Sequence, residues 1–227
     1  MKSAGGTACY GVALLERSPI LKRQTAFVAS VLCVAALLAA ATGLAQTAKK
    51  GKKKMIAPRD YANTLATLQT DQGDITIKFF YDKAPNHVKN FVDLAASGFY
   101  DGTMFHRVIP GFMIQGGDPL TKKPEDPRQP YGTGGNGKNM VKAEFNDTPH
   151  KRGIVSMARA SDPNSASSQF FIVVKDSNFL DGQYSAFGEV VSGMEAADKI
   201  ANVPRDAKDR PNTPVRIKKV VLSEAKS

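Results

Sequence analysis

Two segments in the middle of the chain alternate apolar and polar residues, a pattern typical of half-buried β-strands. They cover residues 64–70 and 74–80 and flank the turn-forming sequence Asp71-Gln72-Gly73. The apolar positions are Leu65, Leu68, Ile75, Ile77 and Phe79. The pattern predicts a β-hairpin at the start of the folded part of the chain.

A helical period follows the hairpin. Val88, Phe91, Val92 and Ala95 recur at the i, i+3, i+4 and i+7 positions of one helix face,. Pro85 suits the first helical position and Gly98 suits a stop,. A second helix is expected over residues 193–201, and its inward residues would be Met194, Ala197, Ile200 and Ala201.

The rest of the pattern consists of short strands. They are expected near residues 104–108, 112–116, 153–158, 169–174, 185–190 and 215–222. Many short strands with only two helices indicate a mainly β domain, either a barrel or a sandwich.

The first 45 residues differ from this domain. Lys22 and Arg23 precede an apolar stretch over residues 25–44, and Gly43 and Ala45 are small residues at the −3 and −1 positions of a cleavage site. We interpret residues 1–45 as a secretory signal peptide whose true start lies downstream of Met1. The expected location is the periplasm or the exterior. The alternatives are an uncleaved anchor in the inner membrane, facing the periplasm, and a buried core helix.

Residues 46–60 contain a lysine-rich tract, Lys49 to Lys54, with too little apolar content to pack, and predict a linker,. Weak contact with an anionic surface is its alternative function. Much of the formal net charge of +10 lies in the N-terminal part, so no specific nucleic-acid binding by the domain at 61–227 is expected. Cys9 and Cys33 also lie there, and their removal would suit an oxidising compartment,.

Candidate chemistry is concentrated in the run 105–118, which combines a Pro110-Gly111 turn with one arginine and one glutamine. The strand period puts Arg107 on one face, and it puts Met113 and Gln115 on one face of the returning strand. An arginine buried beside apolar residues is costly, so it is kept either with a carboxylate partner or for a task. His106 should point to the opposite face and be exposed or hydrogen-bonded.

Two other patterns predict no site. Residues 132–139 match glycine-rich phosphate-binding motifs, but neither a strand before them nor a helix after them is expected, so a flexible loop at the rim of a groove is favoured,. His87, His106 and His150 are far apart and lie in no metal-ligand spacing,. No metal and no cofactor are expected.

Three runs together resemble the cyclophilins, a family of peptidyl-prolyl cis-trans isomerases. They are residues 105–118, residues 156–160 leading to 168–172, and residues 179–182 before 186–188. The resemblance covers roughly residues 62–223 and suggests a bacterial exported form. It implies a closed eight-stranded antiparallel β-barrel capped by two α-helices. It also implies a monomer that acts on proline-containing unfolded or partly folded polypeptides during the folding of exported proteins.

The resemblance also assigns residues. Arg107, Phe112 and Gln115 are the implied catalytic residues, and Arg107 would approach the prolyl nitrogen. The implied substrate-binding residues are Met113, Ala158, Arg159, Gln169, Phe171, Phe179, Leu180 and Tyr184. Rotation about X-Pro breaks no bond, so no nucleophile is needed.

Three of these positions depart from the family pattern. Phe179 stands where many members carry tryptophan, Tyr184 where histidine is common, and Arg159 where asparagine is common. Isomerase activity should persist, whereas members that lack the indole are typically less sensitive to cyclosporin. The competing function is a binding module that holds proline-containing segments without turnover.

Overall fold

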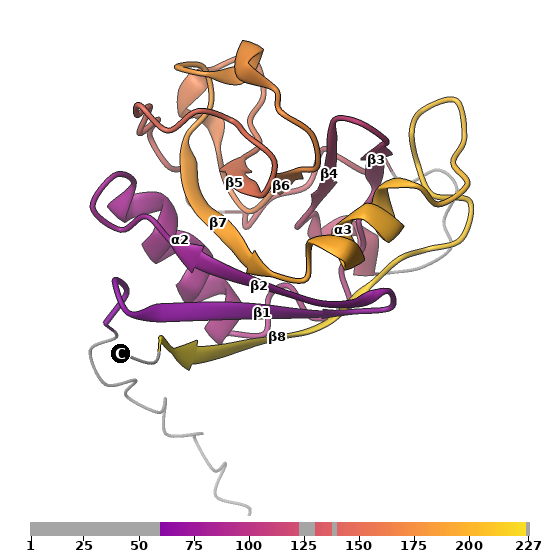
Figure 1. The fold of residues 1–227 in the computed structure, drawn as a ribbon, viewed down its shortest axis with the longest axis horizontal. Coiled ribbons are helices and arrows are strands. Elements are labelled where there is room, and N and C mark those ends of the chain that lie inside the picture. Colours follow the sequence, from indigo (N-terminus) through magenta and orange to yellow (C-terminus); the bar gives the residue numbers. More distant parts are fainter. Residues whose placement is uncertain (1–59, 123–129, 138–139, 226–227) are drawn as a thin grey trace, which may run out of the picture. The chain divides into compact units, whose positions relative to one another are not determined.

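The computed structural model describes residues 60–122, 130–137 and 140–225. They form one curled antiparallel sheet with two α-helices (Figure 1). The strands are β1 (Thr64–Thr70), β2 (Gly73–Phe79), β3 (Arg107–Ile109), β4 (Met113–Gly116), β5 (Ile154–Met157), β6 (Phe170–Val173), β7 (Ala186–Ser192) and β8 (Ile217–Glu224). The helices are α2 (Pro85–Ala96) and α3 (Met194–Ala201), and short 3-10 turns occupy Pro119–Lys122, Pro163–Ser165 and Asn178–Leu180.

The mainly β, eight-stranded antiparallel architecture is confirmed, but a closed barrel is not. The strand order is β3-β4-β6-β5-β7-β2-β1-β8, and no ladder joins the two edge strands. The seam between them carries only an isolated bridge, Met104 with Arg216, and a few backbone hydrogen bonds such as Phe105 N–H to the Val215 carbonyl at 3.0 Å. β3 is too short to continue this pairing, because the predicted strand 104–108 begins as a strand only at Arg107.

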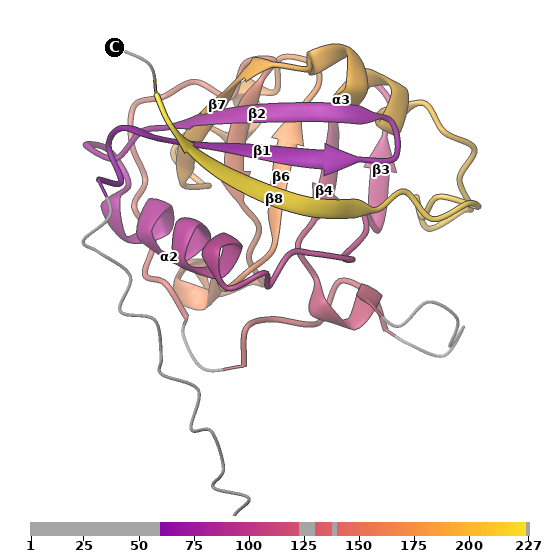
Figure 2. The same cartoon turned by 90° about the horizontal axis from the view of Figure 1, so that it is seen from below.

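The two helices lie at opposite ends of the curled sheet, with α2 below and α3 above in Figure 2, and both bury residues in the main core. α2 buries the four apolar residues that its period predicted, and it also buries His87. α3 buries Ala196, Ala197, Ile200 and Ala201, while Met194 is only partly buried. The centre of this core is aromatic: the Phe91 ring lies 4.8 Å from that of Tyr100 and 5.3 Å from that of Phe170, between ring centroids. The periodic patterns therefore located the core correctly.

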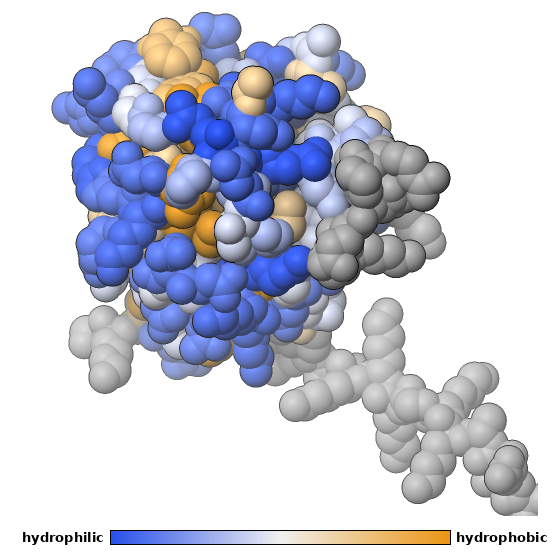
Figure 3. Space-filling model, turned by 90° about the vertical axis from the view of Figure 1, so that its right-hand side faces the viewer, coloured by the Kyte–Doolittle hydropathy of each residue, from blue (hydrophilic) through white to orange (hydrophobic). Residues whose placement is uncertain are grey.

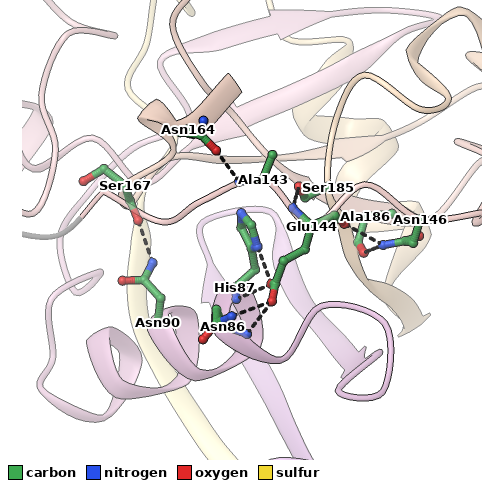
Figure 4. A network of polar contacts seen from close by, with 10 residues as sticks. All are labelled: Asn86, His87, Asn90, Ala143, Glu144, Asn146, Asn164, Ser167, Ser185 and Ala186. Atoms are coloured by element: carbon green, nitrogen blue, oxygen red, sulfur yellow. Dashed lines mark hydrogen bonds and ion pairs between the residues drawn. The ribbon is translucent and has the colours of Figure 1, made fainter. Parts of the chain in front are cut away.

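The N-terminus of α2 is capped from a distant loop rather than by its own flanking residue. Ala84 provides no side-chain cap, and the Glu144 carboxylate instead accepts hydrogen bonds from the backbone N–H groups of Asn86 and His87 (Figure 4). His87 Nδ1 also lies 2.6 Å from Glu144 Oε2. A carboxylate suits this position, because it satisfies helix N–H groups that have no intrahelical partner and complements the helix dipole.

The expectations for residues 1–45 and for the lysine tract lie outside the described residues. Among the residues that the structure describes, no helix is both long enough and apolar enough to cross a membrane.

Candidate active site

The outer face of the sheet carries a second apolar cluster, separate from the core. Its buried members are Met113, Phe171, Val173 and Leu180. β4 and β6 supply three of them, because successive side chains of a strand point to opposite faces,. Ile114, Phe170 and Ile172 of the same strands point inward to the main core. Neither α-helix contributes to the outer cluster.

A hollow of about 120 Å³ opens on this cluster. It is lined by Arg107, Phe112, Met113, Gln115, Ala158, Arg159, Phe171, Leu180 and Tyr184. The sequence predicted each of these nine residues for one site, and the structure brings them together from five separate segments. On the face of the molecule that Figure 3 shows, the surface is mainly hydrophilic and apolar side chains appear only in small patches.

Arg107 and Gln115 face each other across the β3–β4 hairpin, which Gly111, with a φ of 71°, turns. The Arg107 side chain is 45% exposed, so the expectation of a buried arginine is wrong. Its Nε lies 3.9 Å from Asp209 Oδ2, too far for a hydrogen bond,. The guanidinium thus keeps donors available at the edge of an apolar hollow.

Gln169 holds Gln115 in place. Gln115 Nε2 donates to Gln169 Oε1 at 2.9 Å, and Gln169 Nε2 donates to the carbonyls of Gly132 and Gly134. This arrangement leaves Gln115 Oε1 as an acceptor beside Arg107. Gln169, predicted to bind substrate, lines a neighbouring hollow and also positions Gln115 through this hydrogen bond.

A second hollow, of about 340 Å³, adjoins the first, and the two share Gln115, Ala158 and Arg159. The Ala158 N–H bonds to the Gln169 carbonyl and is therefore not available to a ligand. The glycine-rich loop forms one wall of this hollow through Gly132, Thr133 and Gly134. The predicted rim position of the loop is confirmed, but its described part is tied down: Asp118 Oδ2 accepts from the backbone N–H groups of Gly132 and Gly134.

Aromatic rings border the small hollow. The Tyr184 ring stands edge-on to Phe171 at 5.6 Å between centroids. Phe179 does not line the hollow itself; it is 66% exposed and its ring lies 5.4 Å from that of Phe112, which does. Phe179 therefore extends the apolar surface outward from the socket.

His150 lies beneath the hollow, and its role was missed in the sequence. Its buried ring stacks on Phe171 at 6.2 Å, with Nδ1 2.9 Å from Asp181 Oδ1 and Nε2 3.2 Å from Ser156 Oγ. Because Asp181 directly follows Leu180, this histidine connects the two walls of the socket. No spacing pattern in the sequence links residues 150, 156 and 181.

The expectation that His106 is exposed or hydrogen-bonded is wrong. It is only 6% exposed, and neither ring nitrogen has a hydrogen-bond partner among the described residues. It lies beneath the glycine-rich loop, since a Cβ placed on Gly132 would be 3.7 Å from its Nε2. Burial lowers the pKa of His106 to about 4, so the ring is neutral near neutral pH,.

Two other features of the described residues are poor candidates for chemistry. A hollow of about 520 Å³ lies beside α2, but Lys89, Asp93 and Lys142 are part of its lining and it offers no aromatic floor. Within residues 60–122, 130–137 and 140–225, no three His, Cys, Asp or Glu side chains lie close enough together to hold a metal ion.

Comparison with known proteins gives a consistent result. Residues 65–222 match the family model of the cyclophilin type peptidyl-prolyl cis-trans isomerases. A probable peptidyl-prolyl cis-trans isomerase of Brucella abortus is 44% identical over 178 residues, covering 77% of this chain and 85% of that protein. The peptidyl-prolyl cis-trans isomerase A of Dickeya dadantii is 45% identical over 170 residues, covering 72% and 84%.

Among solved structures, a cyclophilin type peptidyl-prolyl cis-trans isomerase of Cryptosporidium parvum superposes with a TM-score of 0.63 at 36% identity. The match covers 70% of this chain and 99% of that one.

Proposed function

The chain belongs to the cyclophilin-type peptidyl-prolyl cis-trans isomerases, and we propose that the apolar hollow beside Arg107 is the site where it catalyses rotation about X-Pro bonds. The observation that carries the proposal is the pairing of Arg107 with Gln115 across β3 and β4, directly at the edge of that hollow. Phe112, Met113, Phe171 and Leu180 provide an apolar socket of a size suited to a proline ring.

Arg107 supplies the chemistry. Amide resonance opposes rotation about the X-Pro bond with a barrier of about 18–20 kcal/mol. As the bond twists, the prolyl nitrogen becomes pyramidal and regains its lone pair, and the Arg107 guanidinium donates a hydrogen bond to it. This bond forms only in the twisted state, so it lowers the barrier instead of merely tightening binding.

Gln115 and the main chain hold the substrate backbone. Because Gln115 Nε2 is engaged by Gln169, its Oε1 accepts a hydrogen bond from a substrate N–H. The Arg159 N–H and the Ala158 carbonyl have no partner among the described residues and line the junction of the two hollows. These groups fix the backbone on both sides of the rotating bond, which the rotation requires.

We propose proline-containing unfolded or partly folded polypeptides as the substrates. The related Cryptosporidium parvum structure was determined in the presence of the dipeptide Ala-Pro, which fits a socket of this kind. The folding of exported proteins is the proposed setting, with a chaperone-like benefit to its clients. This setting rests on the sequence of residues 1–45, and N-terminal sequencing of the processed protein tests it: a chain that keeps residues 1–45 would contradict export by a cleaved signal.

The catalytic proposal is tested by NMR exchange on an Ala-Pro peptide with the purified protein and its Arg107→Ala variant. We expect the acceleration to fall by about 10²–10³-fold in the variant, as for loss of a donor made for the transition state. Lys219→Gln, an exposed change on β8, is the matched loss of one positive charge. Undiminished acceleration by Arg107→Ala would contradict the assigned role. A folded wild-type protein that binds the peptide without accelerating it would favour the holding function.

A further inference from the structure

Two of the three positions that depart from the family pattern are in contact. The guanidinium carbon of Arg159 lies 4.7 Å from the centroid of the Tyr184 ring. We propose that Arg159 makes this isomerase prefer prolines that have an acidic side chain close by in the substrate sequence. The inference rests on the proposed function, because it assigns a specificity to the same groove.

The Arg159 guanidinium is held in a fixed place. Its Nε and Nη2 both donate to the Gln183 carbonyl, at 3.2 and 3.1 Å, and its Nη1 donates to the carbonyls of Ala160 and Ser161, at 3.0 and 3.3 Å. Together with the Tyr184 ring, these bonds fix a side chain that on a free surface would sample many rotamers. The entropic cost of ordering it is therefore met before a substrate binds.

The charge of Arg159 is not neutralised by its surroundings. All of its hydrogen-bond partners are main-chain carbonyls, which orient the guanidinium but leave its net charge intact. No Asp or Glu among the described residues lies within ion-pair distance of it. The nearest acidic residue along the chain, Asp162, points its carboxylate at the N–H of Asn164.

The position of this charge connects it to the reaction. Arg159 lines both the small socket and the larger hollow next to it, so it stands where a chain must pass when its proline fills the socket. Among the described residues no acidic side chain lines either hollow, and Arg107, whose Nε lies 3.9 Å from Asp209 Oδ2, adds a second cationic side chain to the lining of the socket. A Glu or Asp that enters the larger hollow therefore meets an attractive potential, and a Lys or Arg meets a repulsive one.

The expected preference is modest. Arg159 is partly exposed, and ion pairs in such places are worth little because water and salt screen them,. We expect a substrate with Glu at the favoured position to have a kcat/KM about two- to five-fold higher than its Gln counterpart. The difference should lie mainly in KM, because the contact is distant from the rotating bond and equal in the planar and twisted states.

The test uses peptides with one Ala-Pro bond in which Glu, Gln or Lys occupies one nearby position at a time, on either side of the proline. Exchange rates are measured by NMR with the full chain and with Arg159→Gln, Arg159→Lys and Lys219→Gln. At low salt, the wild type should favour Glu over Gln over Lys at one position at least. The Glu preference should vanish in Arg159→Gln, survive in part in Arg159→Lys, persist in Lys219→Gln and shrink at high salt.

Two results would overturn the inference. One is a wild-type enzyme that accelerates the Glu, Gln and Lys peptides equally at every position. The other is a Glu preference that Arg159→Gln retains in full. Both results presuppose acceleration of the parent Ala-Pro peptide, so they are distinct from failure of the proposed function, in which the parent peptide is not accelerated at all.

Discussion

The two faces of strands β4 and β6 have similar apolar compositions but pack against different parts of the protein. On the inner face, Ile114, Phe170 and Ile172 belong to a core that α2 and α3 cover. On the outer face, Met113, Phe171 and Val173 are also buried, yet Met113 and Phe171 line a hollow that the α-helices leave open. The difference teaches that an apolar strand face becomes core or binding socket according to what packs on it, and not according to its own residues.

Polar groups on the two faces differ in the same way. In the core, the Tyr100 hydroxyl donates to the Ser168 carbonyl at 3.1 Å, and burial raises the pKa of Tyr100, so this group is satisfied and inert,. At the socket, Arg107 keeps donors and Gln115 keeps an acceptor that the described residues do not use. The polar group of the inner face is therefore satisfied within the protein, whereas those at the socket remain available for further hydrogen bonds.

Paired truncations give the largest expected effect. Phe170→Ala should lower the free energy of unfolding by about 3–5 kcal/mol, because it leaves a cavity among fully buried rings,. Phe171→Ala should cost less, because its ring already faces the hollow, but it should lower kcat/KM more than tenfold. Denaturant unfolding and NMR exchange on both variants measure this. Equal losses of stability with equal activities would abolish the distinction between the faces.

Acid should lower the free energy of unfolding through His106, which lies beneath the glycine-rich loop. Its pKa is about 4 in the folded protein against an ordinary 6.5, so the unfolded chain takes up a proton more readily,. The contribution of His106 to the free energy of unfolding is complete above pH 6.5 and is lost as the pH falls toward 4,. The loss amounts to about 3 kcal/mol in all,. Burial also lowers the pKa of His87, which adds to the decline in the same direction.

Unfolding free energies of wild type and His106→Gln across this pH range isolate the His106 contribution. We expect the variant to lose less stability between pH 6.5 and 4. Parallel curves for the two proteins would mean that His106 is protonated normally and that the loop does not bury it in solution.

Gln169 tests whether the outer face depends on positioning. Gln169→Leu removes the hydrogen bonds to Gln115 and to the loop carbonyls. We expect kcat/KM to fall about five- to tenfold, because the bond that orients Gln115 is worth about 1 kcal/mol. Gln169→Glu retains an acceptor for Gln115 Nε2 but loses the donor to Gly132 and Gly134, so its defect should be smaller. Identical kinetics for Leu and Glu variants would contradict the role of the Gln115 bond.

The smallest effect concerns the cap of α2, on the covered side. Glu144→Gln should lower the free energy of unfolding by about 1 kcal/mol through a weaker helix cap and leave isomerisation unchanged. Partial burial alone would raise the pKa of Glu144, but the hydrogen bonds from His87 and Asn86 outweigh it and lower the pKa below 4.5. The difference from wild type should therefore be complete above pH 4.5 and disappear as the pH falls through the folded pKa,. A loss of isomerase activity in Glu144→Gln would contradict this prediction and would mean that the helix cap affects the socket.

The resemblance to the cyclophilins predicted the nine residues that line the small hollow. Local patterns predicted the hairpin and both helices, because periodicity and turn residues act over a few positions of the chain. They were less informative about polar groups. The exposure of Arg107, the burial of His106 without partners and the histidine beneath Phe171 depend on segments more than twenty residues away.

The sequence by itself thus determined which side chains alternate and which turn residues reverse the chain, and its resemblance to the cyclophilins indicated the candidate residues for an X-Pro bond. Only the tertiary structure decided which apolar face stays open, which amide orients Gln115, and that Arg159 and Tyr184 meet. The physical reason is that burial and hydrogen-bond partners arise from contacts between distant segments, and these contacts leave no periodic trace in the sequence.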